Sequence, residues 1–174
     1  VYSTYHMTSP AIFYNKEDQW EVPAIDRGGE SVRMEPYYTL MTLPGESQAE
    51  FIQMLPFTPR RRDNLASWMV ARSDGEHYGE LVVYQMPSGN LPEGPGIAAA
   101  NIRSDAQVSQ NDTELGLGSS EVLYGNLLLI PIDNALVYVQ PFYVVSENEA
   151  RRLPQLTKVI ATFGDQVVIE DTLT

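Results

Sequence analysis

Runs of apolar, β-branched and aromatic residues alternate along the chain with short polar stretches rich in glycine and proline. Such runs predict β-strands. We expect strands at residues 37–43, 50–57, 80–86, 121–132, 135–145, 158–163 and 166–171, with a further short one at 97–102. Asp133-Asn134 separates the fifth run from the fourth, and Gly164-Asp165 separates the last two. Two residues cannot form a crossover, so both pairs are predicted to be antiparallel hairpins.

Apolar residues at helical spacing predict short helices at residues 8–20 and 58–72, and capping residues with closing glycines indicate a third at residues 104–115. Residues 25–36, with Gly28-Gly29 at the centre, are interpreted as a loop, and so are residues 44–49 and 87–96. The sequence therefore predicts an α+β fold. It has an antiparallel or mixed sheet, at least two β-hairpins and about three short helices.

The middle helix is predicted to begin at Thr58 and Pro59, because a threonine cap followed by proline is typical of a helix start. Arg60, Arg61 and Arg62 would then occupy the first turn, where the positive end of the helix dipole disfavours cations. Something should compensate these charges, and two interpretations remain open. Carboxylates of this acidic chain could pair with the arginines, or the arginines could bind an external anion such as a phosphate or an acidic sugar.

The candidate anion-binding residues are Arg60, Arg62, Asp63 and Asn64. In the anion hypothesis Arg62 holds the anion, and Asp63 orients it or acts as a base. In the structural alternative Arg62 and Asp63 anchor the predicted helix to the sheet through ion pairs.

Composition narrows the classes of partner. The 174 residues include 23 acidic and 11 basic ones, for a net charge of −12, which argues against nucleic acid or an anionic membrane surface as the main partner. The absence of cysteine excludes disulfides, a thiolate zinc site and a cysteine nucleophile. No apolar run reaches the eighteen or so residues of a membrane helix. We expect residues 1–174 to form a single soluble domain. Because the chain begins at Val1 rather than methionine, we also expect it to be a fragment of a larger protein.

Other chemical signals are weak. His77 lies near Ser73 and Asp74, but this proximity in a turn-rich stretch is ordinary, and we assign no catalytic residue. No metal-binding motif is present, and we expect neither a metal nor a cofactor. Tyr138, Phe142 and Tyr143 could bind a sugar, although their strand spacing favours packing in the core.

Several stretches together resemble one family. "YHMTSPAIFYNKEDQW", "EPYYTLMTLPGE", "LPFTPRRRDNLASWMVARSD", "YGELVVYQMP", "GNLLLIPIDNALVYVQPFY" and "KVIATFGDQVVIEDTL" are similar, in this order, to the C-terminal region of uncharacterised protein family 0182. The matching residues are Pro56, Phe57, Thr58, Pro59, Arg62, Asp63, Asn64, Trp68, Ala71, Arg72, Asp74, Tyr78, Gly79, Gly125, Asn126, Pro131, Tyr138, Pro141 and Tyr143. The chain departs from the family's usual pattern at Ala99 and Asn101, where a glutamate and an arginine are usual.

The resemblance implies a large bacterial multi-pass membrane protein whose C-terminal part lies outside the cytoplasm. We therefore expect a cell-membrane location, with this domain on the extracytoplasmic side and connected to the membrane only through the missing N-terminal part. The expected function is a non-enzymatic binding or scaffold module of the cell envelope, with an envelope protein or polymer as partner and no nucleic acid. The alternative is an enzyme or transport accessory that handles an anionic envelope precursor.

Overall fold

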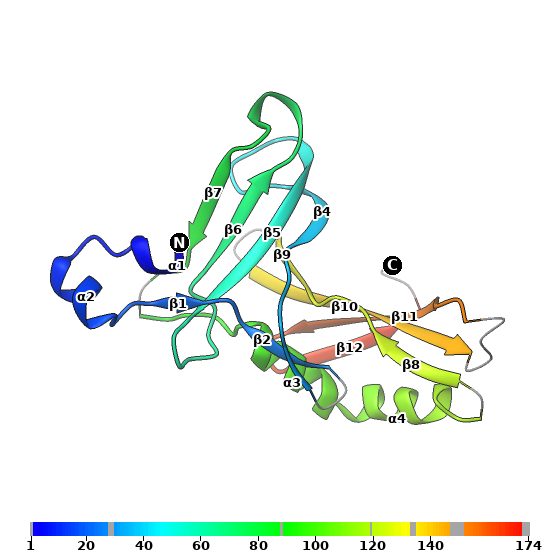
Figure 1. The fold of residues 1–174 in the computed structure, drawn as a ribbon. Helices are drawn as coiled ribbons and strands as arrows, with labels where there is room; N and C mark the ends of the chain where they lie inside the picture. The colour runs from blue at the N-terminus through cyan, green and yellow to red at the C-terminus, as the bar shows by residue number, and fades with distance from the viewer. Residues whose placement is uncertain are drawn as a thin grey trace. The chain divides into compact units, whose positions relative to one another are not determined.

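The computed structural model describes residues 2–27, 30–87, 89–118, 120–132, 135–146 and 152–171 (Figure 1). The chain divides into two compact units, residues 1–97 and 98–174. Over the described ranges the structure contains four α-helices and twelve strands, and every strand pairing is antiparallel. The predicted α+β class is confirmed. The single domain over residues 1–174 stays a prediction.

The first unit is built on a sheet of five strands. These are β1 (Trp20–Glu21), β4 (Tyr37–Thr42), β5 (Ala49–Pro59), β6 (Ser67–Arg72) and β7 (Leu81–Gln85). Their order is β1-β5-β6-β7, and β4 also pairs with β5 (Figure 1). The long strand β5 is central because its earlier residues pair with β4 and its last two pair with β1. The strands predicted at residues 37–43, 50–57 and 80–86 are confirmed.

The two faces of this sheet differ in burial. Ile52, Met54, Trp68 and Val70 point to one face and are at most 2% exposed, as the period of two in a strand requires. On the other face Trp20, Phe57 and Ala66 form a smaller buried cluster, to which Val22, Leu55, Met69 and Val83 add partly buried contacts. The small cluster lies where β1 pairs with the end of β5, next to the arginine segment that follows this strand.

The helix predicted at residues 58–72 is wrong. Thr58 and Pro59 end β5, and residues 67–72 form β6. The spacing from Leu65 to Trp68 and Met69 fits a helix, but Trp68 and Met69 lie on opposite faces of a strand. Burial of Trp68, Val70 and Arg72 on one face decides the structure, and pairing of β6 with both β5 and β7 supplies its hydrogen bonds.

The loop predicted at residues 25–36 is also wrong in part. The antiparallel pair β2 (Ala24–Arg27) and β3 (Glu30–Arg33) occupies most of it. Gly28 and Gly29 lie outside the described residues. Every residue of β3 is exposed, so no alternation of apolar and polar positions signals this strand in the sequence.

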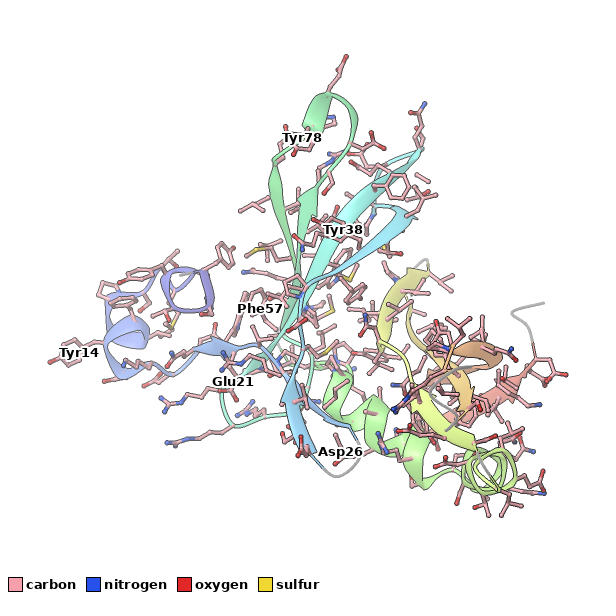
Figure 2. All side chains as sticks on the ribbon, turned by 45° about the vertical axis from the view of Figure 1, so that its right-hand side comes forward. Tyr14, Glu21, Asp26, Tyr38, Phe57 and Tyr78 are labelled. Atoms are coloured by element: carbon pink, nitrogen blue, oxygen red, sulfur yellow. The ribbon has the colours of Figure 1, made fainter. Side chains whose placement is uncertain are left out.

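The predicted N-terminal helix is shorter than expected. Helix α1 (Tyr2–Tyr5) precedes α2 (Pro10–Asn15), with Pro10 in the first turn as predicted. Helix α2 ends at Asn15, because the next residue, Lys16, has a left-handed φ of 56°; strand β1 then begins at Trp20. Tyr14 extends outward from α2 (Figure 2) and is 86% exposed.

The second unit contains a sheet of five strands with the order β12-β11-β10-β8, and β9 also pairs with β10. Its strands are β8 (Ser120–Tyr124), β9 (Leu128–Ile132), β10 (Ala135–Ser146), β11 (Gln155–Phe163) and β12 (Gln166–Glu170). Both predicted hairpins are confirmed by the pairing of β9 with β10 and of β11 with β12. The turn residues Asp133 and Asn134 lie outside the described part of the chain.

The predicted strand at residues 121–132 is interrupted between β8 and β9. Gly125 donates its backbone N–H to the carbonyl of Pro141 at 2.8 Å. A Cβ at Gly125 would lie only 2.9 Å from the Tyr143 ring and 3.2 Å from Pro141, so only glycine fits this close approach. The break lets one long strand, β10, pair with β9 through its first half and with β8 through its last residues.

Two helices precede this sheet. Residues 97–102, predicted as a strand, belong to α3 (Pro95–Ser104), in keeping with the high helix propensity of their three alanines. Helix α4 (Ala106–Leu115) confirms the capped helix predicted at 104–115. The Asp105 side chain accepts from the N–H groups of Gln107 and Val108 at 2.9 and 3.0 Å, and the chain leaves the helix at Gly116.

Candidate anion-binding site

The arginine segment forms a tight turn at the end of β5. The backbone N–H of Arg62 donates to the carbonyl of Pro59 at 3.0 Å, which closes a four-residue turn. Arg61, the third residue of this turn, has a left-handed backbone with φ 66°. Residues other than glycine and asparagine rarely adopt this conformation, because the Cβ crowds the following carbonyl. Three exposed arginines therefore share one strained corner.

An open hollow of about 1050 Å³, which we call the arginine hollow, lies beside this turn. Its lining residues come from three separate parts of the first unit. They are Glu17, Asp18 and Trp20 from around the start of β1, Pro59, Arg60, Arg61, Arg62, Asn64 and Ala66 from the end of β5 and the segment after it, and Gln85, Met86, Gly89, Asn90 and Leu91 from the end of β7 and the loop after it. The hollow therefore combines guanidinium, carboxylate and amide groups.

Within the described ranges, no carboxylate neutralises the three arginines through an ion pair. Among the described residues, neither Asp63 nor any of the three arginines makes an ion pair. Arg60 is held instead by Gln19, whose backbone carbonyl accepts from the Arg60 N–H at 2.7 Å and whose side-chain oxygen accepts from Nη1 at 3.4 Å. The ion pairs expected of Arg62 and Asp63 are thus not found in the described part of the chain.

The two acidic residues of the hollow have other neighbours. The amide of Asn15 donates to Glu17 at 3.1 Å, and a carboxylate oxygen of Asp18 lies 3.6 Å from Nε2 of His6. The His6 side chain is only 4% exposed, and its ring stacks on Trp20 with 3.6 Å between ring centroids. Trp20 therefore lines the hollow with the His6 ring packed against it, and Asp18, which also lines the hollow, lies close to His6.

The structure brings three of the four predicted residues together. Arg60, Arg62 and Asn64 line the arginine hollow, whereas Asp63 lines a separate hollow that also contains Glu21 and Arg33 (Glu21 is labelled in Figure 2). Asn64 is fixed because its side-chain amide donates to the carbonyl of Leu91 at 3.2 Å. The geometry therefore supports a role for Asn64 beside the arginines and separates Asp63 from them.

Arg72 is a polar centre that sequence reasoning missed. It is 8% exposed, and its guanidinium contacts both carboxylate oxygens of Glu50, at 3.0 Å from Nε and 2.5 Å from Nη2. Its Nη1 lies 3.2 Å from Glu46 and 4.0 Å from Glu80. The hydrogen bond to Glu50 raises the pKa of Arg72 above its ordinary value. Glu46 and Glu50 lie four residues apart, but only the pairing of β5 with β6 brings them to Arg72.

His77 lies at the edge of this acidic cluster. It belongs to a short 3-10 helix, Gly75–His77, between β6 and β7, next to the exposed Tyr78 labelled in Figure 2. Its Nδ1 lies 3.1 Å from a carboxylate oxygen of Glu80, and the side chain is half exposed. This contact joins neighbouring turns of the chain and gives His77 a local structural role.

In the second unit, two of the three aromatic residues considered for sugar binding are buried. Phe142 and Tyr138 are 0% and 4% exposed, which agrees with the preferred interpretation that they form core, whereas Tyr143 is only partly buried. Tyr124 donates to Asp112 at 3.2 Å, and the guanidinium of Arg103 lies 4.8 Å from its ring centroid. Burial, together with the nearby Asp112 carboxylate, raises the pKa of Tyr124 to about 12.

Among the described residues, no group of three or more histidine, aspartate or glutamate side chains could hold a metal ion. No helix in the described ranges is both long and apolar enough to cross a membrane.

The fold and the hollow define an α+β protein of antiparallel sheets with an arginine-lined surface site. The chain belongs to the Uncharacterised protein family (UPF0182), whose sequence model matches residues 1–115. It is 49% identical to a UPF0182 protein of Trichlorobacter lovleyi, 47% to one of Geobacter sulfurreducens and 50% to one of Pelobacter propionicus. Each comparison covers 99% of this chain but only 19% of the relative, so the chain spans about a fifth of the length of these curated relatives. No solved structure matches the chain.

Proposed function

We propose that this chain is a non-enzymatic binding module of the cell envelope, carried outside the cytoplasm by a multi-pass membrane protein. Family membership and relatives about five times as long support a part within a larger protein. The observation that carries the binding role is the arginine hollow. Its exposed guanidinium groups make no ion pair with a described residue, and guanidinium groups bind carboxylate and phosphate strongly through paired hydrogen bonds.

The positions of Asp63 and Arg62 favour binding over catalysis. A general base must reach the proton that it removes, either directly or through one water molecule. Asp63 is exposed and lines a different hollow from Arg62, so the pair does not converge on one ligand position. The hollow supports a site that holds an anionic envelope component in place.

A second candidate is a transport accessory or enzyme that handles an anionic envelope precursor. The same hollow favours it, because an accessory protein needs to bind the precursor without transforming it. The two functions differ in whether the bound partner stays associated with the protein. A module retains a stable partner, whereas an accessory or enzyme releases its anionic ligand.

The test is crosslinking and affinity purification of the full-length family protein from its own membranes, followed by mass spectrometry. We expect one recurrent envelope protein or polymer, and we expect its recovery to fall when Arg60 and Arg62 are both changed to glutamine. A matched control is Arg33→Gln, which removes one exposed arginine that lines a different hollow of the same unit. Recovery of no partner, or turnover of an envelope precursor by the purified protein, would contradict the module.

A further inference from the structure

We propose that the arginine hollow binds a small saccharide that carries one phosphate or carboxylate group. The arginine turn holds the anionic group, and the neighbouring amides bind the hydroxyl groups. This inference rests on the proposed function and specifies the ligand of the same site.

The anion must be held mainly by side chains. The backbone N–H groups of Arg60 and Arg62 are already used, by the carbonyls of Gln19 and Pro59 at 2.7 and 3.0 Å. They are therefore not available to cradle a phosphate in the way that glycine-rich loops do. The guanidinium groups remain, and their planar arrangement of donors matches both carboxylate and phosphate.

The charges around the hollow limit the charge of the ligand. Three arginines face two carboxylates, those of Glu17 and Asp18, so the lining residues have a local excess of one positive charge. A polymer with dense negative charge would meet these two carboxylates and a chain with a net charge of −12. A ligand with one anionic group avoids both costs.

The size and amide content of the hollow point to a hydroxyl-rich body. A volume of about 1050 Å³ in this open hollow is much larger than a phosphate ion requires and lies just above the range of about 300–1,000 Å³ that is usual for small-molecule sites. Asn64, Gln85 and Asn90 each carry both a donor and an acceptor, as do the hydroxyl groups of a sugar. Because the amide nitrogen of Asn64 already donates to Leu91, this residue would act mainly through its acceptor oxygen.

Trp20 serves as part of the wall and not as a stacking platform. It is 6% exposed, and the rings of His6 and Phe57 pack against it with centroid distances of 3.6 and 6.2 Å. Aromatic stacking, a common way to bind a sugar face, is therefore not offered by Trp20. Recognition depends on the polar groups of the hollow.

The experiment is isothermal titration of the 174-residue chain with four probes: glucose 6-phosphate, glucuronate, inorganic phosphate and phosphatidylglycerol vesicles. We expect both sugars to bind, with inorganic phosphate weaker and the vesicles without effect. Because each charge-assisted hydrogen bond contributes strongly, Arg60→Gln with Arg62→Gln should weaken sugar binding by about tenfold or more. Arg33→Gln should leave it unchanged.

A separate variant tests whether a side-chain amide of the hollow contributes to sugar binding. Asn90→Ala should weaken glucose 6-phosphate binding and leave inorganic phosphate binding unchanged. Asn90 is exposed, so the fold should survive, and circular dichroism of each variant checks this.

Three outcomes overturn the inference. Equal affinity for inorganic phosphate and glucose 6-phosphate would mean that the hollow does not recognise the saccharide. Binding to the vesicles alone would mean that the ligand is a lipid surface. Failure of the folded chain to bind any probe removes the saccharide as the ligand. The proposed function fails separately: it is contradicted when crosslinking of the full-length protein recovers no partner, or a partner whose recovery does not fall when Arg60 and Arg62 are changed to glutamine.

Discussion

Arg61 should lower the stability of the chain, and glycine in its place should raise it. A left-handed backbone costs an L-residue about 1–2 kcal/mol, which glycine avoids. Glycine in turn loses about 0.5–1 kcal/mol through the greater freedom of the unfolded chain. The difference predicts that Arg61→Gly increases the free energy of unfolding by about 0.5–1 kcal/mol, or roughly 1–4 °C in Tm for a chain of this size.

Arg61→Ala is the matched control. Alanine removes the charge and the long side chain but keeps the Cβ that causes the crowding. Urea unfolding followed by circular dichroism should therefore rank Arg61→Gly above Arg61→Ala, with Arg61→Ala close to the parent chain. Equal stability of the glycine and alanine variants would refute the strain. If the arginine is retained for ligand binding, the more stable glycine variant should also bind glucose 6-phosphate more weakly.

Three further variants test other parts of the structure. Arg72→Met leaves the carboxylates around it without their main cation, so its Tm should fall more than that of Arg72→Lys, and a Met variant as stable as the parent would contradict the ion-pair cluster. The phenol of Tyr124 has a raised pKa of about 12, so the stability that its neutral form provides is present below its ordinary pKa of about 10 and is lost as pH rises toward 12. In Tyr124→Phe the free energy of unfolding, measured by urea unfolding at several pH values between 10 and 12, should fall less steeply with pH than in the parent chain. An unchanged slope of unfolding free energy against pH would exclude the effect. Gly94→Ala would bring a Cβ into the backbone carbonyl of Asp63 and should cost about 1–3 kcal/mol, whereas Gly96→Ala meets only an ordinary contact; equal melting temperatures would contradict this crowding.

The sequence predicts best those elements whose signals are local. The two hairpins of the second unit combine long apolar runs with two-residue connections, and α4 has an aspartate cap and a closing glycine. Strand β3 has no such signal, since all of its residues are exposed. At the end of β5 the local signal is misleading, because Thr58 and Pro59 are typical of a helix start but here end that strand, and residues 67–72 form β6 instead of the predicted helix.

The residues of the candidate site also differ in whether a local signal in the sequence brings them together. Arg60, Arg62 and Asn64 are close in sequence, and one turn brings them to the same hollow. Glu17, Gln85 and Asn90 could not be assigned to that hollow in advance. Their proximity depends on the pairing of β1 with β5 and of β6 with β7, and these registers follow from burial across the whole sheet. Arg72 was missed for the same reason.

The turn is also compatible with the anion binding that we propose for this acidic chain. The charge of −12 is spread over 174 residues, and at physiological salt a charge is screened over about 8 Å. The potential at the hollow is therefore set mainly by the nearest groups, three arginines and two carboxylates. A helix start would have placed these arginines at the positive end of a dipole, where they repel it and need carboxylate partners. A turn at the end of a strand imposes no such dipole, so the arginines can remain exposed without ion pairs and still be compatible with a stable fold.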